Sequence, residues 1–324
     1  MSTGQLRAKA IRILLLCTLF WGLSFPVMKA CGLAQHDLVP AAGNWFITFL
    51  GVMYRFGAAA LILAVFSLSS LRTISRREME QGIVIAVFGA GGIVFQMDGL
   101  AYTQASTCAF LTQGYCVFIP LWVALNHRRL PSLKIVLSTV LVVAGVWVLS
   151  RLNVHDLRLG RGECETLIAS VLLTGQILCL ESPRYAGNRP ENFSTIMFGV
   201  MALMCLPMAV ATAPNAGAFL GAYASPGTCS LLAVLVLFST LISYVMMNYW
   251  QKHVTATEAG LIYCIEPLVA SFLCLFLPAV LSSWVAIHYA NEQLTIRLFI
   301  GGGLILGANV LIQSKWLEPE AAQE

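Results

Sequence analysis

Roughly ten separate apolar stretches alternate with short polar segments along this chain. A helix needs about 20 mostly apolar residues to cross a hydrocarbon core of about 30 Å. Charged residues make up only 10% of the 324 residues, whereas about a quarter is usual in a soluble domain. Lipid cannot satisfy open backbone groups, and the stretches are too long for barrel strands. The sequence therefore predicts an all-α membrane protein with ten transmembrane helices.

The predicted spans form two sets of five. The first set is Ile11–Gly32, Trp45–Leu71, Gly82–Ala101, Thr107–Leu125 and Leu133–Ser150. The second set is Thr166–Leu180, Ser194–Ala213, Thr228–Trp250, Gly260–Val280 and Ile296–Ile312. The first stretch is not expected to be a cleaved signal, because Lys29 and Pro26 lie within it and nine more spans follow.

Positive charges are unevenly divided between the two sides of these spans. If the N-terminus is inside, most of the 19 Lys and Arg fall in cytoplasmic segments. This bias predicts cytoplasmic termini, with tails at residues 1–10 and 314–324. The loop Arg151–Arg161 runs against the prediction, since it places three arginines outside. The net charge of +4 follows from this topology, so we expect no nucleic-acid partner.

The chain contains an internal repeat. Gln104–Pro120 matches Thr255–Ser271 at an offset of 151 residues, which aligns Cys116 with Pro267. A unit of about five spans is odd in number, so the second unit enters the membrane from the opposite side. Such an inverted-topology repeat is the architecture of alternating-access carriers, although chance similarity between two apolar helices is the alternative. The predicted units are residues 11–151 and 163–313.

Six motifs keep the order and spacing of a known family over almost the whole chain. They are Trp21–Leu33, Arg55–Ala64, Tyr102–Leu121, Leu137–Ser150, Lys252–Ala270 and Asn291–Leu311. Together they resemble the drug/metabolite transporter superfamily, specifically its EamA-type families. The resemblance implies a transporter with a central cavity lined by the first, third, fourth, sixth, eighth and ninth spans.

Three features depart from that family's pattern. Cys116 stands where the family usually has a proline, and the turn Asn126–Leu130 lacks the acidic residue that Glu292 provides in the second copy. Leu281–Ala290 is an insertion whose aromatic residues predict anchoring at the membrane interface. These departures indicate a divergent subfamily.

Glu266 is the strongest candidate for substrate binding or coupling. It directly precedes Pro267, and Tyr263 lies three residues earlier on the same expected helical face. Because Pro267 cannot donate a backbone hydrogen bond, we expect a local kink with freed carbonyls. A carboxylate there could bind a cationic group or exchange a proton, which would couple transport to protons. The alternative is a structural acid that caps or pairs with a neighbouring helix.

Further ionisable residues lie toward the outer ends of the first three spans. Asp98 follows Gln96 in the third span, and a buried carboxylate favours a cationic partner. We therefore expect a gate or scaffold salt bridge between Asp98 and either Lys29 or Arg55. Alternatively, the two basic residues face an anionic substrate group, for which Arg55 offers a bidentate contact.

Other spans also carry polar or aromatic side chains, and such groups are candidates for a cavity lining because they are costly in lipid. They are Trp21, Ser24, Gln113, Tyr115, Gln176, Tyr244 and Asn248. For each of them, bonding between helices is the alternative role.

The sequence holds no catalytic, nucleotide-binding or metal-binding motif, so we expect no enzymatic activity, cofactor or metal. The expected function is a secondary transporter of small organic metabolites, driven by a gradient or working as a uniporter. By resemblance, it exports amino-acid-like or amphipathic compounds across a bacterial inner membrane. Its expected partners are the small-molecule substrate and the lipid bilayer. The alternative is a non-transporting membrane protein, such as a lipid-handling or sensory component.

Overall fold

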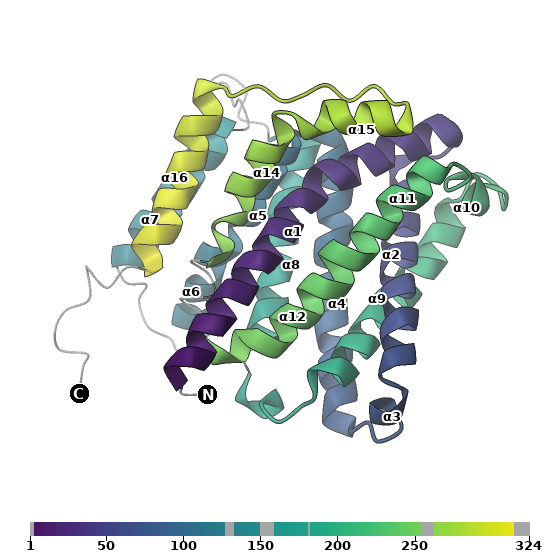
Figure 1. Cartoon of the computed structure of the whole chain (residues 1–324). Coiled ribbons are helices and arrows are strands. Elements are labelled where there is room, and N and C mark those ends of the chain that lie inside the picture. The colour runs from purple at the N-terminus through teal and green to yellow at the C-terminus, as the bar shows by residue number, and fades with distance from the viewer. Residues whose placement is uncertain are drawn as a thin grey trace, which may run out of the picture.

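Helices make up every regular element in the parts of the chain that the computed structural model describes. These parts are residues 3–126, 133–149, 159–180, 182–254, 259 and 262–313. Several predicted features therefore lie outside the described residues: the start of the span at Gly260, most of the repeat before Ile262, and most of the loops after Asn126 and Leu149. Figure 1 shows the helices as one bundle.

Seven helical stretches are long and apolar enough to cross a membrane. They are α1 (Thr3–Leu38), α2 (Asn44–Phe66), α4 (Arg76–Tyr102), α5 with α6 (Ala105–Thr112 and Tyr115–Asn126), α8 (Arg161–Leu180), α9 (Pro190–Thr212) and α11 through η3 (Pro226–Val234, η2 Leu235–Ile242, α12 Ser243–Trp250, η3 Gln251–His253). An eighth is the pair α14 (Glu266–Cys274) and α15 (Leu277–Val285), bent by 61°. The chain is thus a multi-pass membrane protein.

Two further apolar helices are shorter, α7 (Leu133–Leu149) and α16 (Ile296–Gln313). They occupy the fifth and tenth predicted spans, so the count of ten spans stays a prediction. Short elements lie between the long helices: α3 (Leu68–Leu71), η1 (Pro183–Tyr185) and α10 (Ala218–Gly221). We call the end of the bundle with the α1–α2 connection the outer end, after the predicted topology.

Helix starts differ from the predicted span starts where a polar first turn precedes the apolar run. α4 begins at Arg76 and not at Gly82, because Ser75 and Glu78 form a capping box that satisfies two backbone N–H groups. The predicted span Trp45–Leu71 ends early for a similar local reason, since α2 stops before Ser67 and a separate turn follows. Hydropathy predicts which residues lie in the membrane, whereas capping residues determine where a helix begins.

The helices pack in a pattern that relates the two halves of the chain. α2 packs along α9, α7 along α16, and α5 against α14. α4 packs along α8 much as α11 through α12 packs along α1. Two equivalent halves would give this pairing, and the inverted orientation of the second half stays a prediction.

The pair α7 and α16 at one edge of the bundle depends on glycine (Figure 1). A Cβ on Gly145 would lie 2.8 Å from the Gly301 carbonyl, and one on Gly301 would lie 3.0 Å from the Gly145 carbonyl. The two glycines therefore allow the helices to approach closely.

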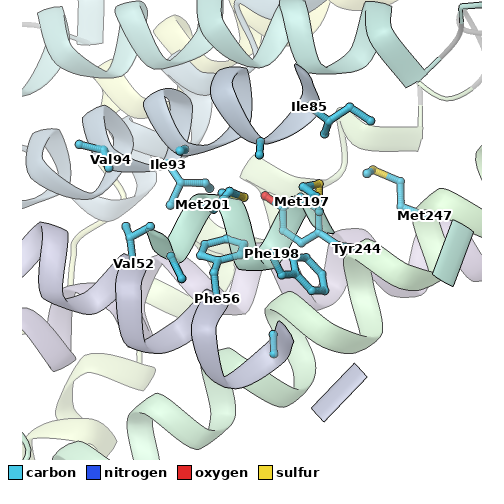
Figure 2. Close-up of a cluster of buried hydrophobic side chains, with 14 of the residues drawn as sticks. Val52, Phe56, Ile85, Ile93, Val94, Met197, Phe198, Met201, Tyr244 and Met247 are labelled. Atoms are coloured by element: carbon cyan, nitrogen blue, oxygen red, sulfur yellow. The ribbon is translucent and has the colours of Figure 1, made fainter. Parts of the chain in front are cut away.

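A hydrophobic cluster fills the space where α2, α4, α9 and α12 meet (Figure 2). Phe56 and Phe198 pack against the Tyr244 ring, with centroid distances of 6.1 Å and 6.2 Å. These edge contacts fix the position of the Tyr244 ring.

The segment after α15 crosses the outer end before α16 begins. Ser282 and Tyr289 exchange side-chain to backbone hydrogen bonds, and Ala286 between them is left-handed, with a φ of 56°. Glu292 then accepts hydrogen bonds from the Ala105 backbone and the Ser106 hydroxyl, so it caps the start of α5. Tyr289 is buried by this fold-back and Trp284 is exposed, so anchoring of this segment at the membrane interface stays a prediction that only Trp284 could satisfy.

Candidate functional site

The fourth predicted span of each half is interrupted at an equivalent position. Gln113 and Gly114 form a turn between α5 and α6, and Cys264 and Ile265 form one before α14. The offset of 151 that aligns the repeats relates the two turns residue by residue. Paired broken helices of this kind typically surround the binding site of a transporter.

The same tight hydrogen bond closes both turns. The Gly114 amide donates to the Leu111 carbonyl at 3.1 Å, and the Ile265 amide donates to the Ile262 carbonyl at 3.2 Å. Each bond spans three residues and not four, so each turn narrows before the next helix begins. Tyr115 and Glu266 are consequently the first residues of α6 and α14.

Gln113 joins the two turns. Its side chain is fully buried, and Nε2 donates to the Tyr263 carbonyl at 3.1 Å and to Glu266 Oε2 at 3.4 Å. In a continuous helix the Tyr263 carbonyl would accept from residue 267, but Pro267 has no N–H. The kink and freed carbonyl predicted beside Pro267 are thus confirmed, and the carbonyl is bonded from the other half. Tyr263 and Glu266 lie on either side of the turn and not on one continuous helical face.

A central cavity lies beside these turns and holds about 640 Å³ of empty space, open solvent at its mouth included. Its lining comes from the six spans that the resemblance implied, and α2 adds Arg55. The lining residues are Trp21, Ser24, Arg55, Ile93, Gln96, Thr112, Tyr115, Leu173, Gln176, Ile177, Leu180, Tyr244, Met247, Tyr263 and Glu266.

One wall of the central cavity is aromatic. The Trp21 ring meets Tyr244 and Tyr263 edge-on, with centroid distances of 5.6 Å and 5.5 Å. Two buried polar atoms of the lining, Trp21 Nε1 and Gln176 Oε1, have no hydrogen-bond partner among the described residues. Buried polar groups are normally bonded, so an orphaned donor and acceptor indicate a place where a polar molecule binds.

Two ionisable groups, one acidic and one basic, also line the central cavity without pairing with each other. Glu266 is 7% exposed and Arg55 is 2% exposed. Among the described residues, Glu266 is bonded only by Gln113, and Arg55 forms no ion pair. Isolated buried charges are expensive. Tyr244 lies within electrostatic reach of both charges, so a small molecule with a cationic and an anionic group could meet them together.

The π-helical segment η2 holds Arg55 in place. Arg55 donates from Nε to the Thr240 hydroxyl, and at 3.2 Å from Nη2 to the Ser239 carbonyl. The Ser239 hydroxyl donates to the Phe20 carbonyl at 2.9 Å, which ties η2 to α1. π-helical turns are rare and often occur at functional sites. The sequence analysis missed Ser239 and Thr240, although adjacent hydroxyl residues within an apolar span were a usable signal.

The expected salt bridge between Asp98 and Lys29 or Arg55 was wrong. Asp98 pairs with Arg161, which also bonds Glu165 at 2.8 Å and covers the Tyr102 ring at 4.1 Å. The reason is helix packing: α8 runs along α4, so the start of α8 lies beside the end of α4. Lys29 instead donates to the Thr103 carbonyl.

The remaining candidates divide among different places. Gln96, Trp21, Ser24, Tyr115, Gln176 and Tyr244 line the central cavity as expected of one site, whereas Gln113 lies behind Glu266. Asn248 lines a separate polar cavity at the inner end, where its Nδ2 donates to the Ser194 hydroxyl at 2.8 Å. Lys29 lines a third cavity near the α1–α2 connection.

Ion pairs close the inner end between α4 and the second half. Arg189 bonds Glu78 at 2.8 Å, and this carboxylate raises the pKa of Arg189 above its usual value. Arg184 bonds Glu80 at 2.6 Å, and Tyr185 donates to the same carboxylate. Burial raises the pKa of Tyr185. Within the described ranges, no group of three His, Cys, Asp or Glu could hold a metal ion.

Comparisons with known proteins bear on the family and the fold of the chain. The EamA-like transporter family matches residues 8–151 of the chain. No curated protein matches the sequence significantly. Sixteen chains among solved structures match the fold. One of them, described only as "Crystal structure of protein", has a TM-score of 0.60 and 14% sequence identity, covering 94% of this chain and 96% of its own length. At that identity the likeness shows the fold alone.

Proposed function

We propose that the chain belongs to the EamA-like transporter family, within the drug/metabolite transporter superfamily, and that it is a secondary transporter of small organic metabolites; the match of the family model to residues 8–151 supports this. The family is one of transporters and not of enzymes. The two paired helix breaks beside a single cavity support alternating access, because such breaks let the two halves rearrange around a fixed site.

The observation that carries the proposal is that an acidic and a basic side chain, Glu266 and Arg55, are both buried in the lining of the central cavity and do not pair with each other. An amino-acid-like or amphipathic substrate would place its cationic group on Glu266 and its carboxylate on the Arg55 fork. Its apolar part would lie against the aromatic wall formed by Trp21 and Tyr263. Binding would then supply both missing counter-charges at once, and Glu266 would exchange its proton for the cationic group during the cycle.

Counterflow of a metabolite library in proteoliposomes tests this proposal. We expect saturable flux for at least one amino-acid-like compound. The absence of flux for every amino acid, amine, nucleoside and drug would instead support a lipid-handling or sensory membrane protein.

We further propose that the protein exports its substrate across a bacterial inner membrane. The family resemblance supports this direction. Cells that express the protein should resist toxic amino-acid analogues in a growth screen. Increased sensitivity would indicate import and overturn the proposed direction.

Both termini are proposed to be cytoplasmic, which the bias in Lys and Arg supports. A cysteine at Ala216, between α9 and α10, should then react with an impermeant reagent in intact spheroplasts, in a background without accessible native thiols. Labelling only after lysis would show that the orientation is reversed.

A further inference from the structure

The cavity near the α1–α2 connection, here the outer cavity, adjoins the central cavity through a single side chain. It holds about 880 Å³ of empty space, open solvent included, and is lined by residues of α1, α2, α4, α11 and η2 and by Tyr223. On α4, Ile93 and Gln96 line the central cavity, and Met97 lines the outer one. Arg55 is the one residue that the two described linings share. The guanidinium therefore stands at the boundary between them.

The charges of the two cavities differ. The central lining includes Glu266 opposite Arg55, whereas the described lining of the outer cavity includes Lys29, Arg55 and His36 and no acidic residue. Glu292 is within electrostatic reach of Lys29 but does not line the cavity. The outer cavity is therefore electropositive, and an anion is the ligand that such a lining favours.

Hydrogen-bond donors in the outer cavity are incompletely used. Arg55 has five N–H groups, and its three bonds, one of them to the weak acceptor Met28 Sδ at 3.2 Å, leave two available. Gln35 is only 1% exposed, and its Nε2 has no hydrogen-bond partner among the described residues. Most of the remaining lining, including Ile47 and Leu100, is apolar. Unused donors beside an apolar wall fit an organic anion better than an inorganic one.

We propose that the outer cavity is a second binding site, that it takes the carboxylate of a small organic acid, and that Arg55 serves both cavities. The carboxylate would accept from the Arg55 fork and from Gln35, with Lys29 supplying further positive charge. A substrate moving between the cavities would then keep one contact throughout. The site itself requires no transport, so it is separable from the proposed function.

Cys31 provides a probe, because it lines the outer cavity, is only 5% exposed and lies within electrostatic reach of Arg55. The full-length protein, with its other nine cysteines replaced, is placed in nanodiscs. Modification rates of Cys31 are measured with anionic sulfonatoethyl and cationic trimethylammonioethyl methanethiosulfonates, each relative to free cysteine. Hexanoate, hexylamine and sulfate are then added as competitors.

We expect the anionic reagent to react faster, and hexanoate to protect Cys31 saturably while hexylamine and sulfate do not. Lys29→Gln should lower the preference for the anionic reagent roughly fivefold, as expected for one charge at short range. Arg55→Lys should keep that preference but weaken hexanoate protection, because lysine keeps the charge and loses the fork. Glu266→Gln is the matched control from the central cavity and should change neither result.

Several outcomes would overturn the proposal. They are no modification by either reagent, preference for the cationic reagent, or protection by sulfate equal to that by hexanoate. If Glu266→Gln lost as much hexanoate protection as Arg55→Lys, the carboxylate of hexanoate would bind in the central cavity and not in the outer one. If Arg55→Lys does not fold, the labelling and protection results for the unaltered protein and for Lys29→Gln still test the proposal. Failure of the counterflow assay would leave hexanoate protection intact, so the two proposals fail independently.

Discussion

The break at Gln113 and Gly114 and the break at Cys264 and Ile265 share a backbone and differ in side chains. Both are closed by a three-residue hydrogen bond, and both deliver the first residue of the next helix into the central cavity. In the first half that residue is Tyr115, a neutral phenol. In the second half it is Glu266, an ionisable group.

This difference shows that the same break in a helix can place either a neutral or an ionisable side chain in the cavity. Glu266 lies in the first turn of α14, where the positive end of the helix dipole offsets part of the cost of burying a negative charge. Tyr115 occupies the equivalent position in α6 without adding a charge. The cavity thus keeps one negative and one positive group, which a fully symmetric pair of breaks would not provide.

The largest expected effect is that of Glu266→Gln. The change keeps size and hydrogen bonding but removes the charge, so we expect normal membrane insertion and at least roughly a tenfold fall in flux, equivalent to about 1.4 kcal/mol. Counterflow at equal protein content measures it.

Tyr115→Phe is the control, since it alters the equivalent position of the first half. Its flux should stay within about threefold, a change under about 0.7 kcal/mol, because phenylalanine keeps the ring and removes no ionisable carboxyl group. Equal losses in the two variants would remove the distinction between the breaks. Normal flux in Glu266→Gln would identify Glu266 as a structural acid.

Gln113→Leu tests the link between the breaks. Leucine approximates the volume but removes the donor from the Tyr263 carbonyl, so we expect a loss of about 1–3 kcal/mol in stability. Thermal unfolding in detergent shows whether Gln113→Leu lowers the melting temperature relative to the unaltered protein.

A double-mutant cycle with Pro267→Ala sharpens this test. Alanine restores an N–H that can reach the Tyr263 carbonyl, so Gln113→Leu should cost less in that background. Strict additivity would show that Gln113 does not compensate for the missing proline N–H.

Gly114→Ala tests the tight packing of the first break. The equivalent residue of the second break is Ile265, which has a large side chain. A Cβ on Gly114 would lie 2.8 Å from Ser170 Oγ, so we expect a loss of about 1 kcal/mol in stability. Removing the hydroxyl in Gly114→Ala with Ser170→Ala should recover most of it. If the double variant is no more stable than the single one, Gly114 is required for the backbone conformation of the turn and not for the space beside Ser170.

The smallest expected effect is that of Pro267→Ala alone. The first break forms with Cys116 at the equivalent position, so proline is not needed for an interruption. Pro267 also lies in the first turn of α14, where a missing N–H costs little. Flux should stay within about twofold of the unaltered protein, a change under about 0.5 kcal/mol. A tenfold loss would show that the second break depends on its proline.

Glu266 and the kink beside Pro267 could be predicted from the sequence because each has a local chemical signal. These signals are an ionisable residue within an apolar span and a residue without a backbone N–H. Sequence reasoning missed the break at Gly114, because a single glycine in an apolar run is also tolerated within a helix. It paired Asp98 with the nearest basic residues of other spans, whereas the structure supplies Arg161 from the start of α8.

By itself, the sequence determined the membrane class, seven of the spans and most of the polar groups in the central cavity. These follow from the solvent, since lipid imposes a minimum apolar length and a high cost on each polar group. Only the tertiary structure decided which polar groups meet. Gln113 and Tyr263 are 150 residues apart, and Arg55 and Thr240 are 185 apart. Their contacts depend on helix rotation and on narrow or widened turns, which side-chain packing sets and hydropathy does not record.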